Sequence, residues 1–437
     1  MRGHSPNALA SAPRSPLRPG VRVNAAVRAH PEPVDRSTPG TGSGLSAALG
    51  AAVERARTWA GDGLCALLLS GSHASGEAVW AEVDGRRVSL SDLDLYAVMR
   101  DEAACTAARA RAAADRFLPG TAAAAGLAAP LEVAFVTFDG LARMPARPGT
   151  VDLVRSGRVI AGDTGLLARL PRWEPAAVSA EERRLLLENR AFDLLAALHT
   201  GGGALGALRS RHAVLKVALD AATARGLAHG ELPAAAAERV ARAREHGAPD
   251  GLPSWLAGAW SNAEPLWQEA LLWRAGEVRG AAPGAAVSDA DGHAASASTW
   301  RAAARVWAAA WWADPLERTA PSDPWERALR AASRGSLARR FRRSLAFRAC
   351  TGATPGVWQR ARFALAGTPA LRIHGSAVVL LLAAAQSPRE PRLPAGALHA
   401  LHRLGVTRAT SFDEAARETV AAWDGQLHDG QRTVAAR

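Results

Sequence analysis

The hydrophobic positions divide the chain into an α/β part and a longer helical part. A helical spacing of apolar residues begins near Gly44. Short apolar or alternating runs then predict strands at Leu64–Ser70, Val88–Met99 and Leu131–Phe138, with Ala- and Arg-rich helical stretches between them. From Ala180 onward, apolar residues lie three and four apart and strand patterns disappear. We therefore expect an α/β (α+β) domain with a small mixed sheet, followed by a mostly α-helical region.

Composition along the chain suggests where these domains begin and end. Residues 1–44 are rich in Pro, Gly, Ser and Arg without an apolar period, which is typical of a disordered basic tail. The Pro, Gly, Ser and Asp residues of 280–299 predict a linker. The expected domains are thus the α/β domain at 45–172, a helical substrate or cleft domain at 173–279, and a Trp- and Arg-rich helical domain at 300–437.

Tryptophan is concentrated in the helical part of the chain. Of the 14 Trp residues, nine lie between Trp255 and Trp325. The spacing of Trp300, Trp307 and Trp311 places these three on one helix face. We expect them to form a Trp-rich core rather than a ligand-stacking site.

The net charge of +12 is concentrated in two segments. Six Arg residues against two acids lie in residues 1–44, and ten Arg residues without an acid lie in 327–362. All but one of the 53 basic residues are Arg, so arginine content alone is poor evidence for nucleic-acid binding. The Arg-rich segment could bind RNA, but a solvated helix face is the favoured interpretation.

Cysteine usage and hydropathy suggest where the protein acts. The three Cys residues are widely spaced and form no C-x-x-C pair, so a cytoplasmic location is expected. No apolar run reaches the roughly 18 to 20 residues that span a bilayer, and we expect no membrane partner.

A turn after the first predicted strand has the composition of a phosphate-binding site. The run Leu67-Leu-Leu-Ser-Gly-Ser-His-Ala-Ser-Gly-Glu77 brings Gly71 and Ser72 to the end of a buried strand, and a helix could start at Ala74. Backbone N–H groups at a helix start, together with a serine hydroxyl, bind phosphate oxygens. His73 lies in the same turn and either contacts a nucleotide or caps the helix.

Three carboxylates follow in an order that suits metal-dependent phosphoryl transfer. Asp92 and Asp94 are two residues apart on a predicted strand, so they share one face with Cα atoms about 6.5 to 7 Å apart. Such a pair can hold two Mg²⁺ ions, which prefer oxygen ligands. Glu132, on the next alternating strand, is the expected third acid; Asp139 and Asp152 resemble loop positions and are weaker alternatives.

The Gly-Ser turn, the Ser-Asp-x-Asp strand and the later acidic strand resemble the nucleotidyltransferase fold of the DNA polymerase β superfamily. The resemblance is closest to the bacterial branch that includes aminoglycoside nucleotidyltransferases and small antitoxin nucleotidyltransferases. It covers Leu64 to about Leu170, including the glycine-bounded segment Ser156-Gly-Arg-Val-Ile-Ala-Gly162. Members of this superfamily often carry a helical domain behind the catalytic one.

The resemblance implies a role for each candidate residue. Gly71 and Ser72 would bind the phosphates of an NTP substrate. Asp92 and Asp94 would ligate two Mg²⁺ ions, and Glu132 would be the third ligand or the base that deprotonates the acceptor. The implied activity is Mg²⁺-dependent transfer of a nucleoside monophosphate from the NTP to an acceptor hydroxyl.

Two features depart from the compact family motif. Residues 82–88 read as an inserted hairpin with an Asp-Gly turn. Ser75 stands where many relatives have Arg. Lys216, the only lysine of the chain, could reach the triphosphate from a helix of the second domain, as in relatives, or could lie on a solvated helix face.

The acceptor is not specified by any motif, and a small molecule is favoured. Transfer to RNA or protein is one alternative. A non-catalytic antitoxin-like or regulatory binding module on the same fold is another.

Overall fold

The computed structural model describes residues 42–83, 86–114, 131–199, 203–275, 289–314, 321–333 and 369–435. The residues from Ser43 onward belong to one compact unit. The expected tail at 1–44 falls almost entirely outside the described residues, as does most of the Arg-rich segment 327–362.

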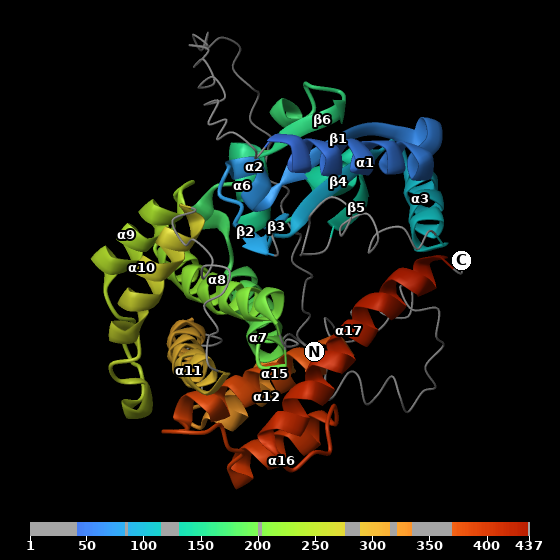
Figure 1. Ribbon diagram of the computed structural model, residues 1–437. Coiled ribbons are helices and arrows are strands. Elements are labelled where there is room, and N and C mark those ends of the chain that lie inside the picture. The colour runs from blue at the N-terminus through green and yellow to red at the C-terminus, as the bar shows by residue number, and fades with distance from the viewer. Residues whose placement is uncertain are drawn as a thin grey trace, which may run out of the picture. The chain divides into compact units, whose positions relative to one another are not determined.

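A four-stranded mixed sheet organises the first part of the chain (Figure 1). Its strands are β1 (Leu64–Ser70), β4 (Leu93–Met99), β5 (Leu131–Thr137) and β6 (Arg158–Gly162). They lie in the order β5-β4-β1-β6, with β1 antiparallel to both neighbours and β4 parallel to β5. The helices that accompany the sheet are α1 (Gly42–Ala60), the short α2 (Gly71–Ser75), α3 (Glu102–Ala114), α5 (Phe138–Ala142) and α6 (Pro148–Ser156).

Alternation along the strands gives the sheet two apolar faces. Leu67 and Leu69 pack in one core with Trp59 of α1 and residues of α3. Ala66 and Leu68 pack in a second core with residues of α5 and α6. Because successive side chains of a strand point to opposite faces, a strand segment buried on both faces is continuously apolar, as β1 is from Ala66 to Leu69.

The expected strand at Val88–Met99 is in fact two strands. A separate hairpin of β2 (Trp80–Val83) and β3 (Arg86–Ser89) ends at Ser89, and β4 begins at Leu93. The break follows from local hydrogen bonding, since Ser91 turns its hydroxyl back to accept the Val79 backbone N–H at 2.9 Å. The inserted hairpin itself is confirmed, with a two-residue connection that lies outside the described residues.

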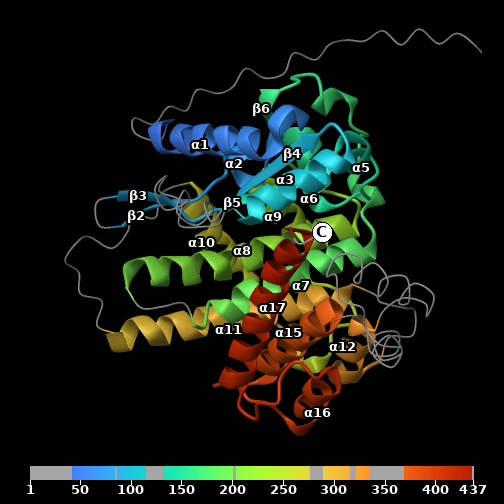
Figure 2. The same cartoon turned by 90° about the vertical axis from the view of Figure 1, so that its right-hand side faces the viewer.

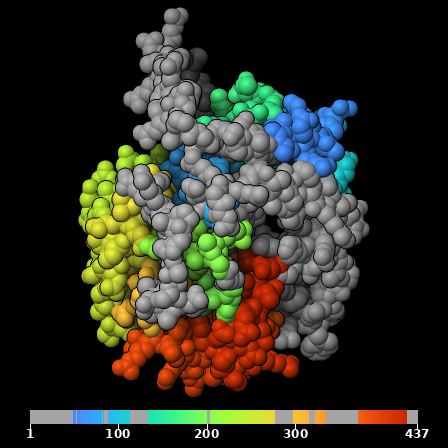
Figure 3. Space-filling view, viewed as in Figure 1, coloured from blue at the N-terminus to red at the C-terminus, as the bar shows by residue number. Residues whose placement is uncertain are grey.

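The rest of the described chain is helical. The helices are α7 (Ala180–Ala196), α8 (Ala204–Ala228), α9 (Ala236–His246), α10 (Ala263–Arg274), α11 (Asp289–Ala313), α12 (Pro324–Ala332), α15 (Pro369–Gln386), α16 (Ala395–Leu404) and α17 (Phe412–Ala435). α8 packs against α7, α9, α10 and α11 (Figure 2). On the face seen in Figure 3, green surface of α7 and α8 lies between the yellow of α9 and α10 and the red of the last helices.

One hydrophobic core runs through the whole helical region. It joins residues of α7, α8 and α10 to residues of α11, α15 and α16, so 173–279 and 300–437 are not two separately packed domains. The expected Trp-rich core is confirmed: Trp300, Trp307 and Trp311 are all buried. Two of their indoles also donate to α7 backbone carbonyls, Trp300 to Leu194 at 2.6 Å and Trp307 to Leu187 at 2.7 Å.

The expected linker at 280–299 is wrong in its second half. α11 already begins at Asp289, and residues 280–288 lie outside the described part. The Ala-rich run from His293 to Ser298 favours a helix, and this propensity outweighs the single Gly292.

Within the described ranges, no helix is both long enough and apolar enough to cross a membrane.

Candidate active site

Gly71 makes a tight turn at the end of β1. Its φ of +67° lies in the left-handed region, and α2 (Gly71–Ser75) begins there rather than at Ala74 as expected. Ser70 pairs with Asp94 across the sheet, which brings the turn beside the acidic strand. A Cβ added to Gly71 would lie only 2.5 Å from Asp94 Oδ2. Glycine therefore allows the backbone of the turn to approach this carboxylate.

The acidic pair lies where β4 begins. Asp92 immediately precedes the strand, and Asp94 is its second residue. The intervening Leu93 and the following Leu95 are buried in the core beneath α1, whereas both aspartates are partly exposed. The pattern agrees with the prediction that the carboxylates share a face, although only Asp94 is within the strand itself.

The two carboxyl groups have opposite pKa shifts. Burial raises the pKa of Asp94, and the charge of Asp92 raises it further. Burial opposes the ionisation of Asp92 as well, but the charge and hydrogen bond of Lys216, together with the charges of Arg190 and His212, outweigh it and lower the pKa of Asp92. The pair thus combines one firmly ionised carboxylate with one whose ionisation an added cation would favour.

Lys216 of α8 contacts the acidic pair directly. Its Nζ donates to Asp92 Oδ2 at 2.6 Å, and both side chains are partly buried. The structure therefore places the only lysine at the site rather than on a solvated helix face. Its contact with a triphosphate stays a prediction.

Three further polar residues near this lysine were not anticipated from the sequence. Arg190 of α7 donates to Asp193 at 2.6 Å and to Asp220 of α8. His212 and Asp220 lie four residues before and after Lys216, on one helix face. This i, i+4 spacing was the only sequence pattern that could have identified His212 and Asp220. It could be used only after Lys216 was known to face the site.

A small hollow, with room for about one water molecule, adjoins Lys216 on α8. Its polar wall includes His212, Arg274 and Trp273, and the Trp273 indole N–H has no hydrogen-bond partner within the described part of the chain. The hollow by itself is therefore too small to receive a nucleotide.

His73 is directed into the protein. It is 4% exposed, and its Nε2 lies 3.1 Å from Ser89 Oγ and 3.3 Å from the Ser91 carbonyl. Its ring also meets Trp80 edge-on. His73 therefore links α2 to the chain that leads to Asp92. A contact with a nucleotide would require an exposed imidazole, and this imidazole is buried. Ser72 beside it is only partly buried.

The backbone of Glu132 is in register with the acidic pair. Its Cα partner across the parallel β4–β5 ladder is Asp94. The carboxylate of Glu132 lies outside what the structure describes. Among the groups it does describe, no three His, Cys, Asp or Glu side chains form a complete metal site.

The two alternative acids are both helical, which corrects their assignment to loops. Asp139 lies in α5, which begins here because Thr137 caps it by accepting the Gly140 backbone N–H. The Asp139 side chain is exposed. Asp152 of α6 accepts two contacts from Arg239 Nη2, at 2.9 and 3.0 Å. Burial raises the pKa of Asp152, and Arg239 opposes this effect. Asp152 is thus engaged in a partly buried ion pair.

The titration of His212 predicts a pH dependence of stability. Burial, followed by the charge of Lys216, lowers the pKa of His212 from 6.5 to about 3. Between these two values the unfolded chain binds a proton that the folded protein does not. The free energy of unfolding should therefore fall as pH drops from about 6.5 toward 3. Urea unfolding across this range should show a shallower pH slope for His212→Asn than for the wild type; equal slopes would contradict the assignment.

Comparison with family models and with curated proteins found no match. No protein-family model matches the chain, and no curated protein matches it significantly. What the site can do therefore follows from its own residues.

Proposed function

We propose that this protein is a Mg²⁺-dependent nucleotidyltransferase that moves a nucleoside monophosphate from an NTP to an acceptor hydroxyl. One observation carries the proposal: each aspartate of the acidic pair lies beside a group suited to phosphates. The Gly71 turn lies against Asp94, and Lys216 donates to Asp92. These groups come from elements far apart in the sequence.

The donor chemistry of the site fits Mg²⁺. Asp92 and Asp94 offer carboxylate oxygens, and Glu132 is in backbone register with them. When bound by these residues, two Mg²⁺ ions would neutralise the charge on the reacting phosphate and on the leaving pyrophosphate.

In the proposed reaction the acceptor oxygen forms a bond to the α-phosphorus, and the bond to the β-phosphate oxygen breaks. The acceptor proton passes to a carboxylate, a role that the family resemblance gives to Glu132, and pyrophosphate leaves. The Gly71–Ser72 turn would orient the phosphate oxygens. Lys216 would contribute a positive charge to the triphosphate, exchanging its present contact with Asp92.

A small molecule is the proposed acceptor, and the cytoplasm is the proposed compartment, in keeping with the free thiols of Cys65 and Cys105. An RNA acceptor has less support. Within the Arg-rich segment, Arg327 is buried and donates to the Trp312 carbonyl at 2.5 Å, so it is unavailable to a polyanion.

The direct test is label transfer. Purified protein is incubated with each α-labelled NTP and Mg²⁺, with and without cell extract, beside Asp92→Asn. Transfer lost in the variant supports the proposal, and the labelled fraction identifies the acceptor as small molecule, protein or RNA. Wild-type protein that neither transfers label nor binds NTP with Mg²⁺ would instead favour a non-catalytic binding module.

A further inference from the structure

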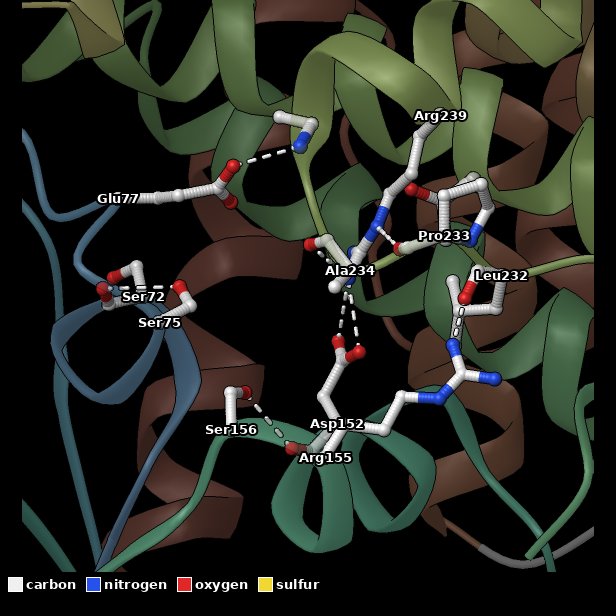
Figure 4. Close-up of polar contacts among 12 residues, drawn as sticks. Ser72, Ser75, Glu77, Asp152, Arg155, Ser156, Leu232, Pro233, Ala234 and Arg239 are labelled. Atoms are coloured by element: carbon white, nitrogen blue, oxygen red, sulfur yellow. Dashed lines mark hydrogen bonds and ion pairs between the residues drawn. The ribbon is translucent and has the colours of Figure 1, made fainter. Parts of the chain in front are cut away.

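The phosphate turn is tied to the helical region by one acidic side chain. Glu77 follows α2, and its backbone N–H donates to the Ser72 carbonyl at 2.8 Å. Its carboxylate reaches away from the turn and accepts the backbone N–H of Ala236 at 2.7 Å. The other carboxylate oxygen pairs with Arg274 at 2.9 Å. Figure 4 shows Glu77 extending from the turn that holds Ser72 and Ser75.

The partners of Glu77 are the ends of two helices packed on α8. Ala236 is the first residue of α9, whose N-cap residue, Ala235, makes no side-chain capping bond. A carboxylate at this end satisfies an unpaired N–H and complements the positive end of the helix dipole. Arg274 is the last residue of α10. Both helices pack against α8, which carries Lys216.

A second polar contact crosses the same interface without touching the turn. Asp152 pairs with Arg239, which also donates to the Pro233 carbonyl at 2.7 Å. Arg155, also on α6, donates to the Leu232 carbonyl. These contacts and that of Glu77 with Ala236 join the sheet region to α9 or to the chain just before it (Figure 4). Of these contacts, only that of Glu77 continues by a hydrogen bond into the Gly71–Ser72 turn.

We infer that Glu77 is a positioning residue that sets the phosphate turn relative to Lys216. The Gly71–Ser72 turn and Lys216, which are expected to hold one triphosphate, come from different parts of the fold. Glu77 bonds to the backbone of the turn and to the two helices that pack against the Lys216 helix. The inference rests on the proposed nucleotidyl transfer, which gives this positioning its function. The effect of Glu77 on the turn can nevertheless be measured without substrate.

Glu77→Gln is the informative substitution. A glutamine keeps an oxygen that can accept the Ala236 N–H, but it is neutral and its NH₂ group is directed at a guanidinium that can only donate. Asp152→Asn is the matched control, because it removes an ion pair from the same interface and leaves the link to the turn intact.

The first measurement is amide hydrogen exchange in full-length protein without nucleotide. Glu77→Gln should speed exchange in residues 71–76 by about tenfold or more, whereas Asp152→Asn should leave these amides near the wild-type rate. Exchange in the turn that is unchanged in Glu77→Gln overturns the inference, as does an equal acceleration in both variants.

The second measurement is the Kd of non-hydrolysable NTP analogues with Mg²⁺, in a double-mutant cycle with Lys216→Met. Glu77→Gln alone should weaken binding about tenfold, but in the Lys216→Met background it should change Kd by less than about twofold. If Glu77→Gln acted only by destabilising the fold, it would weaken binding by the same factor with and without Lys216→Met. That result would overturn the inference. If the wild-type protein binds none of the analogues of ATP, GTP, CTP and UTP, the proposed function is overturned. The role given to Glu77 then falls with it, whatever hydrogen exchange shows.

Discussion

Replacing Asp94 by Asn should abolish nucleotidyl transfer without destabilising the protein. The loss of one carboxylate from a metal-binding pair removes several kcal/mol of charge stabilisation, so label transfer should fall at least about a thousandfold. The thermal stability, in contrast, should not fall. Burial, with the charge of Asp92, raises the pKa of Asp94, so the folded protein disfavours its ionised form. A neutral amide avoids that cost, and Tm at neutral pH should stay equal to that of the wild type or rise.

Asp163→Asn is the control for this substitution. Asp163 is an exposed acid paired with Arg169, outside the acidic pair, and its replacement should leave transfer unchanged. Transfer by Asp94→Asn above about a hundredth of the wild-type rate would remove Asp94 from the metal-binding set. A marked fall in Tm would show that its carboxylate stabilises the fold instead.

Gly71→Ala should also cost most of the activity, for a steric reason. Its Cβ would lie 2.5 Å from Asp94 Oδ2, so the carboxylate would have to move. Because a misplacement of about 1 Å can cost about a hundredfold in rate, we expect transfer to fall by at least that factor. The positive φ adds strain of about 1 to 2 kcal/mol, which should lower the free energy of unfolding measured in urea.

Gly76→Ala separates the two effects. Gly76 ends α2 with a φ of +78°, but an added Cβ there would meet nothing within 4 Å. This variant should lose a similar amount of stability and retain transfer. If both variants lose activity equally, backbone strain rather than the contact with Asp94 explains the result.

Local patterns in the sequence were enough to predict the strands β1 and β5, the inserted hairpin and the buried Trp face of α11. β1 is a continuous apolar run, β5 alternates, the hairpin sequence contains an Asp-Gly pair typical of a turn, and the Trp residues of α11 recur at helical spacing. Neighbouring residues define each of these signals by themselves. The proximity of the Gly71 turn and Asp94 was also predictable in outline. It depends on the pairing of β1 with the adjacent strand β4, in which Ser70 lies opposite Asp94.

The helix at Asp289 and the division of the helical region were predicted less well. Gly, Ser and Asp around residue 290 are typical of loops, yet Ala-rich sequence carries α11 through this stretch. The expected boundary between two helical domains disappeared because the apolar faces of α11 and α15 bury against α7 and α8. Each amphipathic face shows that a partner exists, but it does not identify the partner.

The sequence alone determined which residues carry the candidate chemistry: a Gly-Ser turn, two aspartates two residues apart, and a later acid on the next predicted strand. Only the tertiary structure decided how they are supported. Lys216 meets Asp92 across 124 positions, and Glu77 meets Arg274 across 197. No local period encodes such contacts, because they depend on how the sheet and the helices pack together. The same packing sets the ionisation of Asp92 and Asp94, since burial and neighbouring charge act through space rather than along the chain.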